Sequence, residues 1–183
     1  MTAEVGQYGT FTGAVRVRPR VVTPTVIAPL SGRACVAYRL FIDEAIAGQT
    51  LPWLRRAVST GGVGFLLDGD GALALVEWAH VALDVPVDYH VESGSTRPRK
   101  AHVALLEAHG LPTRGDYRYL EGAVLAGDTV AVTGTALTAP DIDGELFRGY
   151  REHASDVLRL VGSQAKPLWL RSQPRPEGRL GPR

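Results

Sequence analysis

Four side chains that could bind a metal ion lie within eleven residues of one another: His80, Asp84, Asp88 and His90. In an extended strand all four share parity and face the same side, but at about 3.3 Å per residue they span about 33 Å. A single ion could collect them only if the chain turned sharply, for example at Pro86, because metal sites need converging ligands. We therefore expect a polar strand face here, and we predict neither a metal centre nor a cofactor.

Two residues could serve as nucleophiles, Cys35 and Ser31. Cys35 lies in an apolar stretch with no histidine nearby in the sequence, which predicts a buried structural thiol. Ser31 lacks the Gly-x-Ser-x-Gly elbow of hydrolases, and hydroxyl side chains are common in turns. No glycine-rich phosphate-binding motif precedes a helix. These observations predict a protein that is not an enzyme.

The segment Asp68-Gly69-Asp70-Gly71 alternates carboxylates with glycines, as the first ligands of a calcium-binding loop do. The later glutamate ligand and the flanking helices of such a loop are missing. Apolar runs lie on both sides, and glycine supplies the positive φ that tight turns need. The pattern therefore predicts a β-hairpin.

Basic side chains form a candidate binding surface in two segments of the chain, a strand face with Arg16 and Arg18 and a second basic loop with Arg97, Arg99 and Lys100. The formal charge of the chain is +1, with 20 basic and 19 acidic residues. The last 13 residues hold four arginines and one glutamate, which leaves 16 basic and 18 acidic residues in positions 1–170. Bulk charge therefore does not favour a polyanion binder, and solvated arginines on an exposed sheet face are the simpler interpretation.

A single cysteine excludes an intrachain disulfide and any cysteine-rich zinc module, and it fits a reducing compartment. The most apolar long window, residues 72–87, contains Glu77, His80 and Asp84 and so does not resemble a membrane span. The first four residues lack the basic and apolar regions of a signal peptide. We expect a cytoplasmic protein, with the arginine-rich tail as a weak electrostatic contact to a membrane surface.

Length and composition predict one domain over residues 1–172 and a disordered tail over 173–183. With 21 glycines and 12 prolines, turns are frequent and short strands are favoured. Alternating or β-branched runs predict strands at residues 10–18, 21–28, 34–42, 51–60, 117–125, 129–135, 146–150, 157–161 and 168–170, with a helical turn as the alternative at 146–150. Residues 64–75 supply the two strands of the hairpin, and residues 77–88 are expected to form a strand or strands interrupted at Pro86.

One helix is predicted, from about residue 98 to residue 109, with Ser95 or Thr96 as its N-cap and Gly110 beyond its end. Its apolar side chains Val103, Leu105 and Leu106 should be buried. The two histidines of this segment, at positions 102 and 109, are expected at the surface or its boundary, because they lack the spacing of zinc-binding helices.

Three stretches also resemble a known family. They are Ala28 to Arg39, reading Ala-Pro-Leu-Ser-Gly-Arg-Ala-Cys-Val-Ala-Tyr-Arg; Trp53 followed by the segment Phe65 to Ala74; and Glu121 followed by Leu125 to Gly134. In this order and spacing they resemble the GIDE domain, also called BAM for "beside a membrane", of mitochondrial and chloroplast E3 ubiquitin ligases and of many bacterial proteins. The residues that carry the resemblance are Pro29, Ser31, Gly32, Cys35, Tyr38, Asp68, Gly71, Glu121, Gly127, Asp128 and Gly134.

The resemblance implies a non-catalytic, β-rich recognition or regulatory domain that binds a protein or peptide partner, with contact to a membrane surface as a possible setting. Ubiquitin ligase activity does not carry over, because one cysteine cannot supply the zinc ligands of a RING. Together with the strand pattern, the resemblance predicts a compact OB-like β-barrel with one helix, the alternative being a β-sandwich.

Nucleic acid is a disfavoured partner. Even so, the alternative function is an OB-like binder of single-stranded nucleic acid, using the aromatic residues Tyr38, Trp78 and Tyr89, which are expected to be exposed. A metal-dependent hydrolase built on the histidines and aspartates of residues 80–90 is the least favoured.

Overall fold

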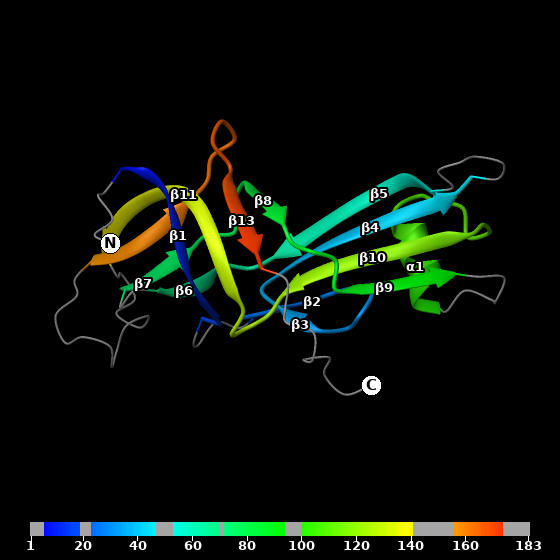
Figure 1. Cartoon of the computed structure of the whole chain (residues 1–183), viewed down its shortest axis with the longest axis horizontal. Helices are drawn as coiled ribbons and strands as arrows, with labels where there is room; N and C mark the ends of the chain where they lie inside the picture. The colour runs from blue at the N-terminus through cyan, green and yellow to red at the C-terminus, as the bar shows by residue number, and fades with distance from the viewer. Residues whose placement is uncertain are drawn as a thin grey trace.

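A computed structural model describes residues 6–18, 23–46, 53–69, 72–93, 100–140 and 156–173, which form thirteen strands and one helix. The molecule is elongated, with a β-barrel at one end and a helix-backed sheet at the other (Figure 1). The prediction of a β-rich barrel fold is therefore confirmed.

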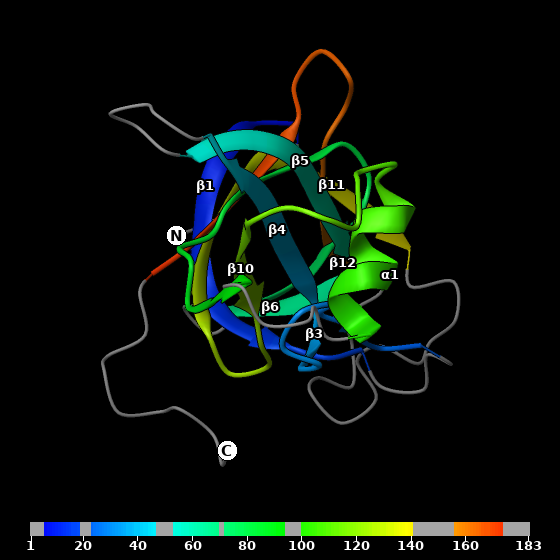
Figure 2. The ribbon, with the colours of Figure 1, turned by 90° about the vertical axis from the view of Figure 1, so that its right-hand side faces the viewer.

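Five strands close the barrel in the order β1 (Tyr8–Arg16), β6 (Phe65–Gly69), β7 (Ala72–Val76), β12 (Asp156–Val161) and β11 (Thr129–Pro140). Two more, β13 (Leu168–Ser172) and β8 (Val81–Asp84), extend the sheet beyond β11. The pairs β12–β7 and β13–β8 are parallel, and the others are antiparallel. Figure 2 looks along the long axis and shows the barrel strands as a ring behind the helix.

Strand β1 closes the barrel by pairing with two partners in succession. Its residues 8–14 pair with β11, and its residues 14–16 pair with β6. At the change of partner the backbones come very close, since a Cβ atom on Gly13 would lie 2.5 Å from the carbonyl oxygen of Asp68. Glycine is therefore required at this corner. Inside, alternate residues of the strands such as Val15, Phe65 and Leu160 form the barrel core.

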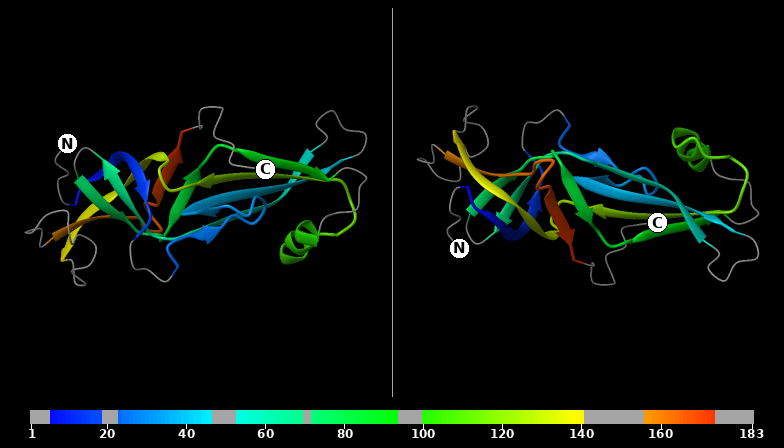
Figure 3. Two further views of the ribbon diagram at one scale, coloured as in Figure 1. Left: turned by 90° about the horizontal axis from the view of Figure 1, so that it is seen from below. Right: turned by 90° about the horizontal axis from the view of Figure 1, so that it is seen from above.

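The second sheet has the order β5 (Trp53–Gly62), β4 (Ala37–Ala45), β10 (Tyr117–Val124) and β9 (Tyr89–Ser93), all antiparallel. Helix α1 (Lys100–Ala108) covers one face of it. Leu106 of the helix packs there on Leu40, Ile42, Tyr117 and Tyr119. Figure 3 shows no other described element stacked on the opposite face. A two-stranded piece, β2 (Val26–Ile27) with β3 (Ala34–Cys35), flanks the sheet.

The predicted helix is confirmed as Lys100–Ala108; residues 98 and 99 of the prediction lie outside the described residues, and the helix ends one residue earlier than expected. It ends as expected for a glycine after the last turn: Gly110 has φ +63°, and its N–H donates to the carbonyl of Glu107. His102 was expected near the surface, which is wrong. It is buried and stacks on Tyr119 with ring centroids 4.7 Å apart, because it lies on the same helix face as Leu106. The proposed N-caps, Ser95 and Thr96, lie outside the described residues.

The hairpin predicted around residues 68–71 is confirmed as β6–β7, although Asp70 and Gly71 themselves lie outside the described residues. The strands predicted at residues 10–18, 51–60, 117–125, 129–135, 157–161 and 168–170 are found with small shifts. The strand predicted at 34–42 divides at Val36 into β3 and β4, and that at 21–28 is reduced to β2. Of the run predicted at residues 77–88, only β8 is a strand, and the expected interruption lies at Pro86, which has no backbone N–H for a strand hydrogen bond. Strand β9 was not predicted. The strand at 146–150 and the tail from residue 174 lie outside the described residues.

Candidate functional site

The turn at residues 29–32 lies at the tip of the β2–β3 hairpin. The N–H of Gly32 donates to the carbonyl of Ala28 over 2.9 Å, and the N–H of Ala28 donates to the carbonyl of Arg33 over 2.9 Å. Gly32 has φ +71°, a conformation that residues with a Cβ rarely adopt. The sequence Pro-Leu-Ser-Gly-Arg therefore builds a tight corner.

Glu121 of β10 anchors this corner from 90 residues away. Its side chain is fully buried and accepts hydrogen bonds from the Leu30 N–H (2.7 Å), the Ser31 N–H (3.2 Å) and the Ser31 Oγ (2.5 Å). A buried carboxylate needs such donors, because leaving it without partners costs several kcal/mol, on the order of 3–5. The signature residues Ser31 and Glu121 are thus brought together.

Arg33 completes the arrangement. Its two terminal nitrogens donate to the two carboxylate oxygens of Asp88 over 2.8 and 2.7 Å, and its Nε donates to the Ser31 Oγ over 2.9 Å. The hydrogen bonds to Asp88 raise the pKa of Arg33 above its usual value, against the opposing effect of burial. We call Ser31, Arg33, Asp88 and Glu121 the corner cluster.

The corner cluster does not resemble a catalytic triad. The Ser31 hydroxyl donates its proton to Glu121 and accepts from Arg33, and no described histidine contacts it. Cys35 next to the cluster is fully buried, with its Sγ 3.6 Å from the Val26 carbonyl oxygen, so the predicted buried thiol is confirmed. Burial, helped by the charge of Glu121, raises the pKa of Cys35 to about 11, which disfavours the nucleophilic thiolate.

The four metal-ligand candidates of the sequence are spread apart. Asp84 pairs with Arg171 over 2.7 Å and Asp88 pairs with Arg33, while His80 and His90 are exposed. Within residues that the structure describes, no three side chains of histidine, cysteine, aspartate or glutamate are placed to hold a metal ion.

The predicted basic surface is also divided. Arg16 lies on β1 and pairs with Asp68 over 2.5 Å, and Arg18 follows that strand, whereas Lys100 begins α1 at the other end of the molecule (Figure 1). Arg97 and Arg99 lie outside the described residues. The structure therefore does not bring the described members into one surface.

Of the aromatic candidates for stacking, only Tyr89 is exposed. Tyr38 and Trp78 are half-buried, because their rings lie against Gly61 and Gly62 of β5, respectively. The contact is close, since a Cβ atom added to either glycine would lie 2.5 Å from the ring. Their expected exposure is wrong.

The remaining signature residues have local structural roles. At the turn from β10 to β11, the Leu125 N–H donates to the Asp128 carboxylate over 2.7 Å, and Gly127 has φ +87°. Gly134 of β11 lies close to Leu168, where a Cβ would be 3.4 Å from its Cγ. These positions shape the barrel rather than an open site.

The face of the second sheet opposite α1, which no described element covers (Figure 3), carries a cluster of arginine and aromatic side chains. On β4, the alternating residues Arg39, Phe41 and Asp43 point away from the helix-side residues Leu40 and Ile42. A register shift between Ile42 and Asp43 lets β5 place Arg55 opposite Asp43, and β10 places Arg118 there from the other side. We call this surface the arginine face; it comprises Arg39, Phe41, Asp43, Trp53, Arg55 and Arg118.

Stacking orders the guanidinium groups of the arginine face. The Cζ atoms of Arg39 and Arg55 lie 4.5 and 3.9 Å from the centre of the Phe41 ring, and that of Arg118 lies 4.8 Å from a ring centre of Trp53. Such cation–π contacts contribute about 0.5–1 kcal/mol at exposed sites. The three arginines are therefore held in preferred positions before any partner arrives.

Asp43 binds two of these arginines together. Its carboxylate is 1% exposed and accepts hydrogen bonds from the Nε of Arg55 and, over 2.9 Å, from the Nε of Arg118. Burial alone would raise the pKa of Asp43, but these hydrogen bonds and charges outweigh it and lower the pKa. This site was not predicted from the sequence, although the alternation of Arg39, Phe41 and Asp43 with two aliphatic residues was the available signal.

We predict that Asp43→Asn lowers the free energy of unfolding by about 1–3 kcal/mol at pH 7, because the two arginines lose a charged acceptor. A carboxylate with a depressed pKa stabilises the fold above its unfolded-state pKa of about 3.9 and loses that effect as the pH falls through its folded-state pKa. Urea unfolding between neutral and acidic pH should therefore show the difference between wild type and Asp43→Asn shrinking at the acidic end. A difference that stays constant with pH would contradict this assignment.

Comparison with known proteins supplies no relative: no family model, no curated protein and no solved structure matches the chain. The resemblance to the GIDE domain stays a prediction. None of the helices in the described ranges has the length and apolar character to cross a membrane.

Proposed function

We propose that this protein is a non-catalytic interaction domain and that its arginine face binds an acidic segment of a partner protein. The observation that carries the proposal is the set of three stacked guanidinium groups, two of them bonded to one buried carboxylate, on a sheet face that no described element covers. Arginine and tryptophan are enriched among the residues that contribute most to protein interfaces.

The balance of charged side chains on the arginine face indicates that its partner is acidic. The arginine face carries three arginines and two carboxylates. The carboxylates are Asp43 and Glu92, a residue of β9 that pairs with Arg118 of β10. Asp43 is already satisfied by two of the arginines. Arg39 donates one hydrogen bond, from Nη1 to the Leu83 carbonyl over 2.8 Å, and its other N–H groups bond no described residue. An aspartate or glutamate of a partner is the complement to such a group.

Apolar side chains share the same face. Val58 of β5, which pairs with Phe41, is 49% exposed, and Leu120 of β10, which pairs with Phe41 from the other side, is half-buried. A partner segment that combines acidic with apolar or aromatic residues would satisfy both the guanidinium groups and this surface.

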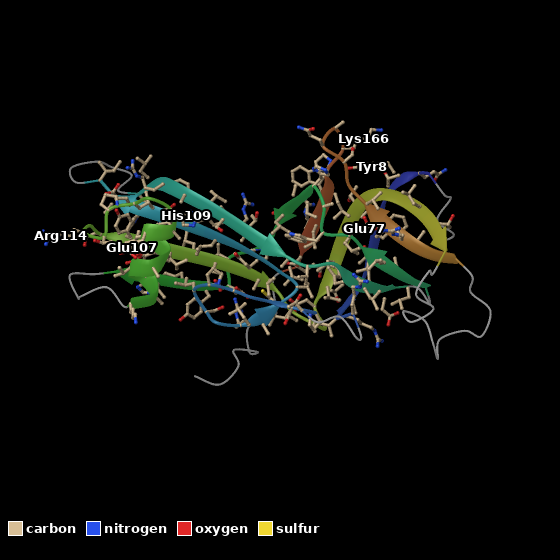
Figure 4. The ribbon with its side chains drawn as sticks, turned by 180° about the vertical axis from the view of Figure 1, so that it is seen from behind. Tyr8, Glu77, Glu107, His109, Arg114 and Lys166 are labelled. Carbon is tan, nitrogen blue, oxygen red and sulfur yellow. The ribbon has the colours of Figure 1, made fainter. Side chains whose placement is uncertain are left out.

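A selection of random displayed peptides on the purified protein tests the proposal. We expect the enriched sequences to combine Asp or Glu with apolar residues and to bind more weakly as the salt concentration rises. Arg39→Glu should weaken binding at least about tenfold. Arg114→Glu provides the matched control, since it makes the same charge change at an exposed site beyond α1 (Figure 4).

Equal binding of the selected peptides to wild type and Arg39→Glu would overturn the proposal, as would a selection that enriches no acidic sequence. Thermal unfolding of each variant checks that the fold is intact. If Arg39→Glu unfolds, Arg39→Gln removes the charge without introducing a repulsive carboxylate, and the same loss of binding is expected.

A further inference from the structure

A second, independent candidate site lies on the outside of the barrel. Four neighbouring strands, β1, β11, β13 and β8, form a shallow groove of about 240 Å³. It is lined by Thr10, Asp84, Ala131, Thr133, Trp169 and Arg171. The strand register brings these residues together in two rows across the strands. In one row Thr133 pairs with Thr10 on one side and Trp169 on the other; in the second row Arg171 pairs with Ala131 and with Asp84.

Trp169 is the central side chain of this groove. It is 50% exposed, whereas its neighbours Leu168 and Leu170 are fully buried in the barrel core. The indole therefore contributes little to the core and presents a flat apolar surface to solvent. A large exposed aromatic side chain beside polar groups is typical of a ligand-stacking position.

The polar groups around the indole are both donors and acceptors. The Arg171 Nε donates to an Asp84 carboxylate oxygen over 2.7 Å, and the Oγ atoms of Thr10 and Thr133 lie 2.7 Å apart. Asp84 and Arg171 keep 54% and 73% of their side chains exposed, so both can bond a ligand as well as each other. The groove carries one positive and one negative charge.

We infer that this groove binds a neutral carbohydrate. The apolar face of a sugar ring would stack on Trp169, and its hydroxyl groups would exchange hydrogen bonds with Asp84, Arg171 and the two threonines. An exposed aromatic side chain also stacks nucleic-acid bases in proteins that bind single strands. Charge favours the carbohydrate, since a nucleic acid requires cations for its phosphates. The only arginine that lines the groove is matched by a carboxylate, and Lys166, whose Nζ lies 5.9 Å from the centre of the Tyr8 ring, adds one cation outside it.

A second aromatic residue extends the same face. Tyr8 is 45% exposed and pairs with Thr135, two residues along β11 from Thr133 (Figure 4). Strand spacings of about 4.8 Å and a rise of about 3.4 Å per residue place Tyr8 roughly 12 Å from Trp169. Two exposed aromatic side chains at that separation fit an oligosaccharide, with one sugar ring stacked on each.

Nuclear magnetic resonance of the ¹⁵N-labelled protein tests the inference. The chain has three tryptophans and hence three indole N–H signals, and Trp169→Phe assigns that of Trp169. The probes are linear neutral oligosaccharides of glucose, mannose, xylose and N-acetylglucosamine. We expect at least one of them to shift the Trp169 signal at roughly 10 mM, a concentration that detects dissociation constants near 1 mM.

In Trp169→Ala the indole signal is lost, so the backbone amide signals of the groove residues report binding, which should weaken at least about tenfold; Asp84→Asn should weaken it severalfold. Thr113→Val, at an exposed position between α1 and β10, is the control that should leave binding unchanged. The inference is overturned if no oligosaccharide shifts the Trp169 signal, if binding survives in Trp169→Ala, or if oligothymidylate binds the groove more tightly. Peptide binding to the arginine face is measured separately, so failure of either proposal leaves the other standing.

Discussion

Replacing Glu121 with alanine should lower the free energy of unfolding by about 3–5 kcal/mol, the largest loss that we expect from a single polar substitution. Alanine leaves the N–H groups of Leu30 and Ser31 without their acceptor and opens a void under the corner. Each buried donor without a partner costs about 1–3 kcal/mol. Urea denaturation followed by circular dichroism measures the loss.

Two variants separate the contributions within the corner cluster. Glu121→Gln keeps the volume and one acceptor oxygen and should cost about 1–3 kcal/mol, whereas Ser31→Ala, which removes one hydroxyl donor, should cost about 1 kcal/mol. If Glu121→Ala unfolds at the same urea concentration as wild type, the carboxylate does not anchor the corner as described.

Replacing Gly13 with valine should lower the free energy of unfolding by about 3 kcal/mol, at the upper end of what overpacking costs. A Cβ at this position would lie 2.5 Å from the carbonyl oxygen and 2.7 Å from the carbonyl carbon of Asp68. Both neighbours are backbone atoms, so a rotamer change cannot relieve the overlap. To make room, β1 would have to move away from β6 and the barrel would open at its closing corner.

The neighbouring substitution Thr12→Val is the matched control, because Thr12 is exposed on the same strand and exposed substitutions usually change stability by less than about 0.5 kcal/mol. Equal stability of Gly13→Val and Thr12→Val would show that the barrel tolerates a side chain at its corner. Denaturant titrations of the two variants in parallel decide the matter.

Local patterns were sufficient to predict most, but not all, of the individual elements. The Asp-Gly-Asp-Gly turn between two apolar runs gave the β6–β7 hairpin, and Gly110 gave the end of α1. Both depend on residues that are neighbours in the sequence, where turn and capping chemistry acts directly. His102 shows the limit, because its burial depends on which helix face the sheet covers.

The corner cluster could be predicted only in part. The resemblance singled out Ser31 and Glu121, but it did not indicate that Arg33 and Asp88 join them across 55 residues. Such partners depend on strand order and register, which a single sequence does not specify. Trp169 was missed for a different reason: its exposure follows from the alternation with Leu168 and Leu170, once the strand is known to have a buried side.

The closure of the barrel by β1 and β11 also bears on how the chain is made. Thr10 and Thr133, which face each other across that seam, are 123 residues apart. At a synthesis rate of about 5–20 residues per second, β1 waits roughly 6–25 s on the ribosome before β11 emerges. Throughout that interval Phe11 and Val15 have no barrel to enter, and the long edge of β1 can pair with other chains. Aggregation of nascent chains, rather than instability of the finished barrel, is therefore the hazard that this topology creates.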